Sequence, residues 1–368
     1  VGRLVQGAGA AAIPSRASVT VARALPAGRR GFAFGLIGTG LGAGQALGPV
    51  LGGVIAELAG WRSLFLGTAV LSAVVLVGAS RTLPGGAGAD RGGWRRLDLL
   101  GGCLLSGAFG LALFAVTMGQ AHGFVAVTSW GSLLVAVALA VAFTARIRSA
   151  PSPFAPPALF GNRAFRRAAG VGFVTQFAYL GSIVLVPQLA STVNGLSTGQ
   201  VGLVLLPGAV AVAVLSPLVG RASDRVGSRP LVTAGLGVLA AAVLSLSTLA
   251  GSSAFTIGAI LLGMGAGLAL VTSPLVNAAS AALLDGYSGI GLGLYQSAFI
   301  FGGGSGAAVL GAVLSARDAA LTAWNPLHSG PGAAFSDTLL VVAAVLLGAL
   351  LAARRLPSRP RRAADLGR

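Results

Sequence analysis

Charged and metal-binding residues are scarce in this chain. Only 9% of its 368 residues are charged, and none of the 25 basic residues is a lysine. The single cysteine, Cys103, excludes an intramolecular disulfide and a cysteine metal site. So low a charged fraction, in a chain that is 55% hydrophobic and contains 58 glycines, excludes a water-soluble globule.

Long apolar runs dominate the chain instead. A helix needs about 20 such residues to cross roughly 30 Å of hydrocarbon. The sequence has eleven runs near this length, at 4–22, 32–56, 63–80, 98–118, 124–145, 168–190, 200–219, 231–249, 255–282, 291–314 and 337–353. It therefore predicts an all-α integral membrane protein with about eleven transmembrane helices.

The arginines fall almost entirely on one side of these runs. When alternate connections are assigned to one side, that side carries 21 arginines and the other carries two, Arg62 and Arg317. This bias assigns the arginine-rich side, with the basic tail 354–368, to the cytoplasm. The net charge of +17 thus reflects topology, and we expect no nucleic-acid partner. Eleven crossings that end in the cytoplasm begin outside, so if the intact protein also starts in the cytoplasm, we expect an odd number of helices to precede Val1.

The first 31 residues contain the pattern R-x-x-Q-G-x-G-A-A followed by an Arg-Gly pair. The matching positions are Arg3, Gln6, Gly7, Gly9, Ala10, Ala11, Arg30 and Gly31. The pattern resembles motif B of the major facilitator superfamily, which lies on the fourth transmembrane helix of that family. The resemblance implies that Arg3 takes part in a proton relay. An arginine at a helix centre costs about 2.5 to 3.5 kcal/mol, so it needs a partner or water.

A glycine-rich pattern with one proline follows directly. Its positions are Gly35, Gly44, Gly48, Pro49, Gly52 and Gly53, which resemble motif C, the antiporter signature on the fifth helix of the same family. Glycines also recur every four residues at 40, 44, 48 and 52, which predicts a stripe without side chains where another helix approaches closely. Pro49 cannot donate to the carbonyl of Gln45, so we expect a bend there. An ordinary packing face is the alternative, but the adjacent motif B favours a transporter.

The stretch "GRASDRVGSRP", residues 220–230, resembles motif A of the same superfamily, G-x-L-a-D-R-x-G-R-R. It keeps Gly220, Asp224, Arg225, Gly227 and Arg229, and departs from the motif at Ala222 and Ser228. We place Asp224 in a cytoplasmic connection at a helix boundary, where it can cap helical N–H groups and pair with arginines. Such a latch can hold one conformation closed, whereas a solvated turn with incidental charges is the alternative.

The motifs also indicate how many helices precede the chain. Five runs separate motif C from this copy of motif A, where a twelve-helix member has three. The additional pair, about 98–145, resembles the fourteen-helix drug:proton antiporter subfamily, of which three helices are then missing. We expect residues 1–82 to complete an N-terminal bundle, 83–148 to form the extra pair, and 149–353 to form a six-helix C-terminal bundle.

Polar residues within the apolar runs are candidates for a substrate cavity. They are Gln45, Gln176, Tyr179, Ser273, Asn277 and Gln296. Together they predict a neutral pocket of apolar and amide groups, which suits large lipophilic compounds. Ordinary interhelical hydrogen bonds, worth about 0.6 kcal/mol each, are the alternative. The stretch 288–314, which contains Tyr295 and Gln296, resembles the penultimate helix of the subfamily.

Two other patterns point to different functions. Gly38, Gly40 and Ala43 fit a dinucleotide-binding G-x-G-x-x-G/A, but no strand precedes them. Ser305 lies in a G-x-S-G pattern as in intramembrane serine proteases, but His122 and His328, the two histidines, are assigned to external connections. We therefore expect no enzyme activity, no metal and no cofactor.

The resemblance implies a secondary transporter that exports lipophilic drugs or antibiotics in exchange for protons, driven by the proton gradient. No acidic residue lies mid-membrane, and in this subfamily an aspartate of the first helix usually couples the proton. We expect a monomeric plasma-membrane protein whose partners are lipid, protons and the substrate. The alternatives are export of an endogenous antibiotic or siderophore, or a truncated membrane protein that does not transport.

Overall fold

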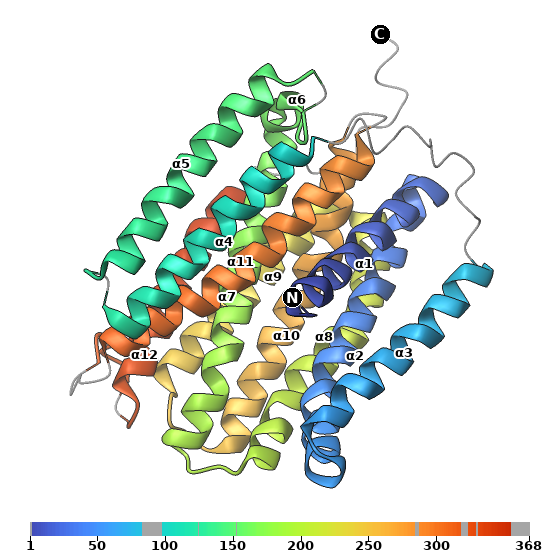
Figure 1. Cartoon of the computed structure of the whole chain (residues 1–368). Coiled ribbons are helices and arrows are strands. Elements are labelled where there is room, and N and C mark those ends of the chain that lie inside the picture. Colours follow the sequence, from blue (N-terminus) through green and yellow to red (C-terminus); the bar gives the residue numbers. More distant parts are fainter. Residues whose placement is uncertain are drawn as a thin grey trace.

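The computed structural model describes residues 2–82, 98–123, 125–151, 153–283, 287–317, 323–328 and 330–354. Within them the chain forms helices and no strand (Figure 1). The helices are α1 (Gly2–Ala24), α2 (Ala27–Ala59), α3 (Trp61–Thr82), α4 (Leu99–His122), α5 (Val127–Ser149), α6 (Pro157–Gly161), α7 (Arg163–Thr192), α8 (Thr198–Val226), α9 (Ser228–Thr248), α10 (Ala254–Ala281), α11 (Ser288–Ala316) and α12 (Ala333–Ala353).

Each predicted apolar run falls on one of the long helices, which confirms the all-α fold class. Among the described residues, nine helices are long and apolar enough to cross a membrane, namely α3 to α5 and α7 to α12. The other two, α1 and α2, have 23 and 33 residues, which is long enough to cross a membrane. Nine of the eleven predicted crossings therefore meet both the length and the apolarity criterion.

One predicted boundary is wrong. We expected residues 220–230 to begin as a connection, with Asp224 in it, but α8 continues to Val226 and carries Asp224. The helix ends there because Gly227 adopts a φ of +84°, a conformation that favours glycine. The carboxylate of Asp224 is thus held on a rigid helix.

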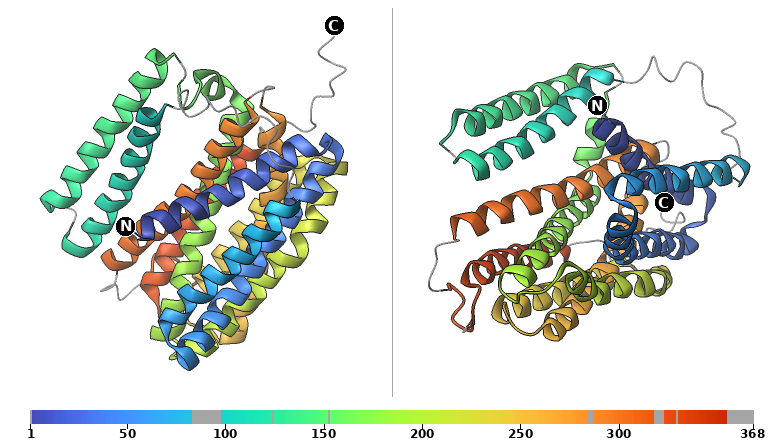
Figure 2. Two further views of the ribbon diagram at one scale, coloured as in Figure 1. Left: turned by 45° about the vertical axis from the view of Figure 1, so that its right-hand side comes forward. Right: turned by 60° about the horizontal axis from the view of Figure 1, so that its bottom comes forward.

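Helices α7 to α12 pack around an apolar core, and α2 lies along α8 on one side of them. α1 and α3 contact α2, and α1 also contacts α11. α3 is almost unburied, with Phe65, Leu66 and Val70 among its exposed side chains. α4 and α5 form a hairpin that packs against α11 and diverges from the other helices (Figure 2).

The contact between α7 and α11 depends on glycines. A Cβ at Gly302 would fall on the backbone of Phe173, and one at Gly306 would fall on the backbone of Phe177. Because both positions advance together by four residues, the two helices run parallel. The absence of side chains at these positions lets the backbones approach closely.

An ion pair at the ends of α11 and α12 fixes the connection between them. Arg317, which follows α11, donates from Nε to Oδ2 of Asp337 over 2.7 Å, and the backbone N–H of Trp324 donates to Oδ1 over 2.6 Å. The Arg317 guanidinium also lies 4.4 Å from the centre of the Trp324 ring. Asp337 is fully buried, so these contacts supply the partners that a buried carboxylate requires.

The α4–α5 hairpin is fastened at both of its ends. Asp98, the N-cap of α4, accepts from the N–H groups of Gly101 and Phe154 and from Nε of Arg146 on α5. At the far end, the Ser129 hydroxyl donates to the carbonyl of Ala115 over 2.8 Å. Between these ends, the Phe109 ring of α4 stacks on the Phe301 ring of α11 with centroids 4.1 Å apart.

The N–H of Gly101 chiefly holds the pKa of Asp98 below its ordinary value, with help from the N–H of Phe154 and the Arg146 guanidinium, and against the effect of burial. A carboxyl with a lowered folded pKa stabilises the fold above its ordinary pKa of about 4, and this contribution is lost as pH falls through the lowered value. We therefore predict that amide exchange in the first turn of α4, corrected for its intrinsic rate, becomes faster below about pH 4.

Asp98→Asn keeps the cap but removes the charge, so exchange should lose this pH dependence; Asp98→Ala should accelerate exchange about fivefold at neutral pH, as expected for loss of an N-cap. Mass spectrometry of the purified protein measures both effects. The first turn of α10, capped by the uncharged Ser253, is the internal control. An unchanged pH dependence in Asp98→Asn would contradict this account.

Candidate functional site at the contact of α2 and α8

The backbones of α2 and α8 meet along a face of α2 that lacks side chains. A Cβ at Gly31 would fall on the carbonyl of Gly220, one at Gly35 on the backbone of Ser216 and Pro217, and one at Gly42 on the backbone of Ala213. Positions rise along α2 as they fall along α8, so the helices are antiparallel. The start of α2 therefore lies beside the end of α8.

At this end, the Asp224 carboxylate binds the backbone of α2. Oδ1 accepts from the N–H of Gly31 over 2.8 Å, and Oδ2 accepts from the N–H of Phe32 over 3.1 Å. Asp224 therefore accepts from helical N–H groups, but Gly31 and Phe32 are the fifth and sixth residues of α2, so the carboxylate binds past the first turn and not at the N-cap. The contact joins Gly31 to a residue 193 positions away in the sequence.

The predicted pairing of Asp224 with arginines is wrong for this structure. In the described residues no arginine lies within ion-pair distance of Asp224, and Arg225 and Arg229 are exposed. The reason is the glycine at position 31, because a Cβ there would lie 2.5 Å from Oδ1 of Asp224. Without that atom, the carboxylate reaches the α2 backbone directly.

Most of the predicted motif C stripe does not face α8. At Gly40, Gly44, Gly48 and Gly52, no described atom lies within 4 Å of an added Cβ, whereas Gly35 of the same motif is in close contact. The α2 helix is continuous through position 49. The side chains of Gln45 and Pro49, and the surroundings of Gly53, lie outside the described part, so the expected bend stays a prediction.

The motif B residues lie near the start of α1. Gln6, Gly7 and Gly9 are exposed, and no described atom lies within 4 Å of a Cβ at either glycine. The side chain of Arg3 is outside the described part of the structure. Its role in a proton relay therefore stays a prediction.

Two of the predicted cavity residues are buried on the neighbouring helices α7 and α11. Gln296 is buried and donates from Nε2 to the Ser18 hydroxyl of α1 over 3.2 Å. Gln176 is buried beside Gly303, and within the described residues its Oε1 has no hydrogen-bond partner. The side chain of Tyr295 is 1% exposed, and its hydroxyl likewise has no hydrogen-bond partner within the described residues. These groups can donate to or accept from a ligand if the helices separate.

The remaining cavity candidates lie elsewhere. Tyr179 belongs to the apolar core of α7 to α12. Ser273 of α10 is buried, with its hydroxyl 3.8 Å from a Cβ added at Gly38, and Asn277 is half-buried one turn further on. The five candidates whose side chains the structure describes therefore do not form one pocket in this conformation.

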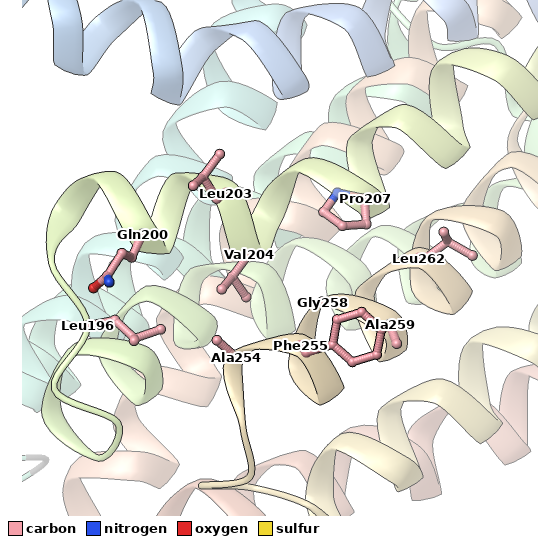
Figure 3. Close-up of a pocket in the computed structure, with 10 residues that line it drawn as sticks. All are labelled: Leu196, Gln200, Leu203, Val204, Pro207, Ala254, Phe255, Gly258, Ala259 and Leu262. Carbon is pink, nitrogen blue, oxygen red and sulfur yellow. The ribbon is translucent and has the colours of Figure 1, made fainter.

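A cavity of about 460 Å³ lies between the first turns of α8 and α10 (Figure 3). Its walls are apolar except for Gln200, and its other lining residues include Leu203, Pro207, Phe255 and Gly258. Below it, α8 and α10 cross closely, because a Cβ at Gly265 would fall on the backbone of Gly208. None of the predicted site residues lines it, and the one sequence signal for it is a proline and a glycine on facing helices.

Parts of the chain are similar to known proteins. Residues 1–84 match the model of the Major Facilitator Superfamily. A multidrug resistance protein, Stp, of Mycobacterium tuberculosis is 31% identical over 318 residues, which cover 85% of this chain and 58% of that protein.

Two further proteins are also similar to this chain. The tetracenomycin C resistance and export protein of Streptomyces glaucescens is 29% identical over 320 residues, covering 86% of this chain and 58% of that protein. The crystal structure of the human organic anion transporter MFSD10 superimposes with a TM-score of 0.44 at 15% identity, covering 94% of this chain and 83% of that chain. The chain spans little more than half the length of the first two relatives.

The α2–α8 geometry predicts different outcomes for two glycine substitutions. Gly35→Leu places a side chain on the backbone of Ser216, and overpacking of this kind costs about 1 to 3 kcal/mol. Spin labels at Gly28→Cys and Val226→Cys, in a Cys103→Ser background, report the separation of the two helix ends, and we expect Gly35→Leu to lower the closed population about tenfold. Gly48→Leu, with no described neighbour within 4 Å, should leave the distance unchanged. Equal losses in both variants would refute the assigned packing face.

Proposed function

We propose that this chain is part of a fourteen-helix antiporter of the plasma membrane that exports lipophilic drugs or antibiotics in exchange for protons. In this proposal α1 to α3 are the fourth to sixth helices, α4 and α5 are the extra pair, and α7 to α12 are the C-terminal bundle. The arginine-rich tail lies in the cytoplasm and the protein acts as a monomer. The names of the multidrug resistance and antibiotic export relatives support the substrate class.

The observation that carries this proposal is the contact of α2 with α8. Transporters of this architecture work by rocking two helix bundles about a central site, which requires contacts that close one side of the site and can be released. Asp224 and Gly31 provide such a contact between the two bundles. The arginine distribution assigns it to the cytoplasmic side, so the Asp224 latch favours the outward-facing state.

The unoccupied glycine stripe of α2 and the exposed α3 support the rest of the architecture. The stripe at Gly40, Gly44, Gly48 and Gly52 offers a surface without side chains, and α3 exposes apolar side chains along its length. We propose that helices of the N-terminal bundle cover both surfaces in the intact protein. The coupling carboxylate then lies in those helices, and Arg3 is its partner in the proton relay.

Export of an endogenous antibiotic is the second candidate. The match to the tetracenomycin C resistance and export protein favours it, since that relative is named for both resistance and export. A membrane protein without transport activity is the third candidate. Only the first two require a flux that depends on a gradient.

We predict that the intact protein, in everted membrane vesicles with an acidic interior, accumulates a lipophilic cation such as ethidium. Collapse of the pH gradient with nigericin should stop the uptake, because proton efflux from the vesicle drives it. Vesicles without the protein are the control. Uptake that ignores the gradient would refute antiport, and gradient-driven flux of a producer metabolite without ethidium flux would select the second candidate.

Replacement of the buried glutamines of α7 and α11 should change the affinity for the substrate. Gln176→Leu and Gln296→Leu remove polar groups that we assign to the substrate cavity, so the apparent KM for the transported probe should rise about three- to tenfold, as for loss of one hydrogen bond. Gln188→Leu, at an exposed position of α7, should leave the KM unchanged. An equal rise in all three variants would remove the glutamines from the cavity.

A further inference from the structure

Next to the hydrogen bonds that Asp224 of α8 accepts from α2, a second contact joins these two helices. The guanidinium carbon of Arg221 lies 4.1 Å from the centre of the Phe32 ring. Arg221 is on α8, three residues before Asp224, and Phe32 is on α2, directly after Gly31. Residues three apart on a helix lie on neighbouring positions of one face, so both side chains of α8 reach the same turn of α2.

Phe32 therefore takes part in both contacts. Its backbone N–H donates to Oδ2 of Asp224, and its half-buried ring stacks against Arg221. Stacking of the ring limits the rotation of this turn of α2 relative to α8. That restriction keeps the N–H groups of Gly31 and Phe32 directed at the carboxylate, which accepts from both.

We propose that Arg221 is a positioning residue of this latch, whose stacking on Phe32 holds the first turns of α2 in register with the Asp224 carboxylate. This inference rests on the proposed transport function. It assigns a role to a position that motif A leaves unspecified. The latch then has two parts with different chemistry. The Asp224 carboxylate, which binds the N–H groups of Gly31 and Phe32, can be neutralised by a proton, whereas the cation–π contact of Arg221 with Phe32 does not depend on protonation of Asp224.

The arginine keeps its charge at every physiological pH, so the stacking contact persists whether or not Asp224 is ionised. Protonation of Asp224 would weaken its hydrogen bonds to Gly31 and Phe32, but the Arg221–Phe32 contact would remain. Arg221 thus sets how far the latch opens when the carboxylate is neutral. Loss of the stacking should therefore increase the open state by a similar factor at every pH measured.

The test measures the separation of the two helix ends in the intact protein. Spin labels at Gly28→Cys and Val226→Cys, in a Cys103→Ser background, report the distance at pH 6 and pH 8 in nanodiscs. For Arg221→Ala and Phe32→Leu we expect the ratio of open to closed populations to rise about two- to fivefold at both pH values, as for a surface cation–π contact. Phe32→Tyr keeps the aromatic face and should restore the wild-type ratio.

Matched controls separate stacking from charge and from hydrophobic loss. Arg148→Ala removes another exposed arginine of the same side, and Phe160→Leu removes another exposed phenylalanine; neither should change the distances. The double variant Arg221→Ala with Phe32→Leu should show no more opening than either single variant, because one contact is lost in each case.

Three results would overturn the inference. They are an unchanged distance in Phe32→Leu, additive effects in the double variant, and the same opening in Arg148→Ala. Gradient-driven ethidium uptake by the wild type, measured on the same preparation, tests the proposed function separately. Uptake without any effect of Arg221→Ala refutes the positioning role alone, and absence of uptake refutes the transport proposal while the distance measurement still decides whether the contact forms.

Discussion

The structure depends on backbones that meet without side chains between them. Along α2 and α8 the contact is made by glycines facing carbonyl and Cα atoms, and the same arrangement joins α7 to α11. In hydrocarbon, helices gain little from burying apolar side chains, because lipid is equally apolar, so close packing of this kind supplies the attraction. Each such contact brings polar backbone groups within reach of the neighbouring helix. Asp224 of α8, for example, accepts hydrogen bonds from two N–H groups of α2.

The buried and half-buried carboxylates also depend on hydrogen bonds from nearby backbone groups. Asp98, Asp224 and Asp337 each accept at least two hydrogen bonds, and in every case at least one donor is a backbone N–H. Two of them also bind an arginine, and Asp224 binds the start of a helix instead. A buried carboxylate without such partners would be costly, so loss of one partner at these positions is expected to destabilise the helix ends.

Features that depend on neighbouring residues in the sequence could be predicted from it, whereas features that depend on tertiary contacts could not. The positions of the long helices depend on apolar length, which is a local property, and they were predicted well. The partner of Asp224 depends on which backbone approaches it, and only tertiary packing decides that. α2 carries two glycine faces, one at 31, 35, 38 and 42 and the other at 40, 44, 48 and 52, and spacing alone could not show that the first meets α8. Gln176 and Gln296 were predicted as polar residues within helices, but the hydrogen bond from Gln296 to Ser18 depends on which helix lies beside α11, and only the fold decides that.

The hairpin of α4 and α5 has a mechanical consequence. It is closed at both ends, and the ring of Phe109 stacks on Phe301, whose own ring lies 6.0 Å from that of Phe173 on α7. A continuous series of rings thus connects the outermost helices to the pair that carries Gln176 and Gln296. We expect lateral pressure of the bilayer on the hairpin to be transmitted to α11 through these rings. The thickness and composition of the lipid should then affect the packing of α7 against α11, the helix pair that we assign to the substrate.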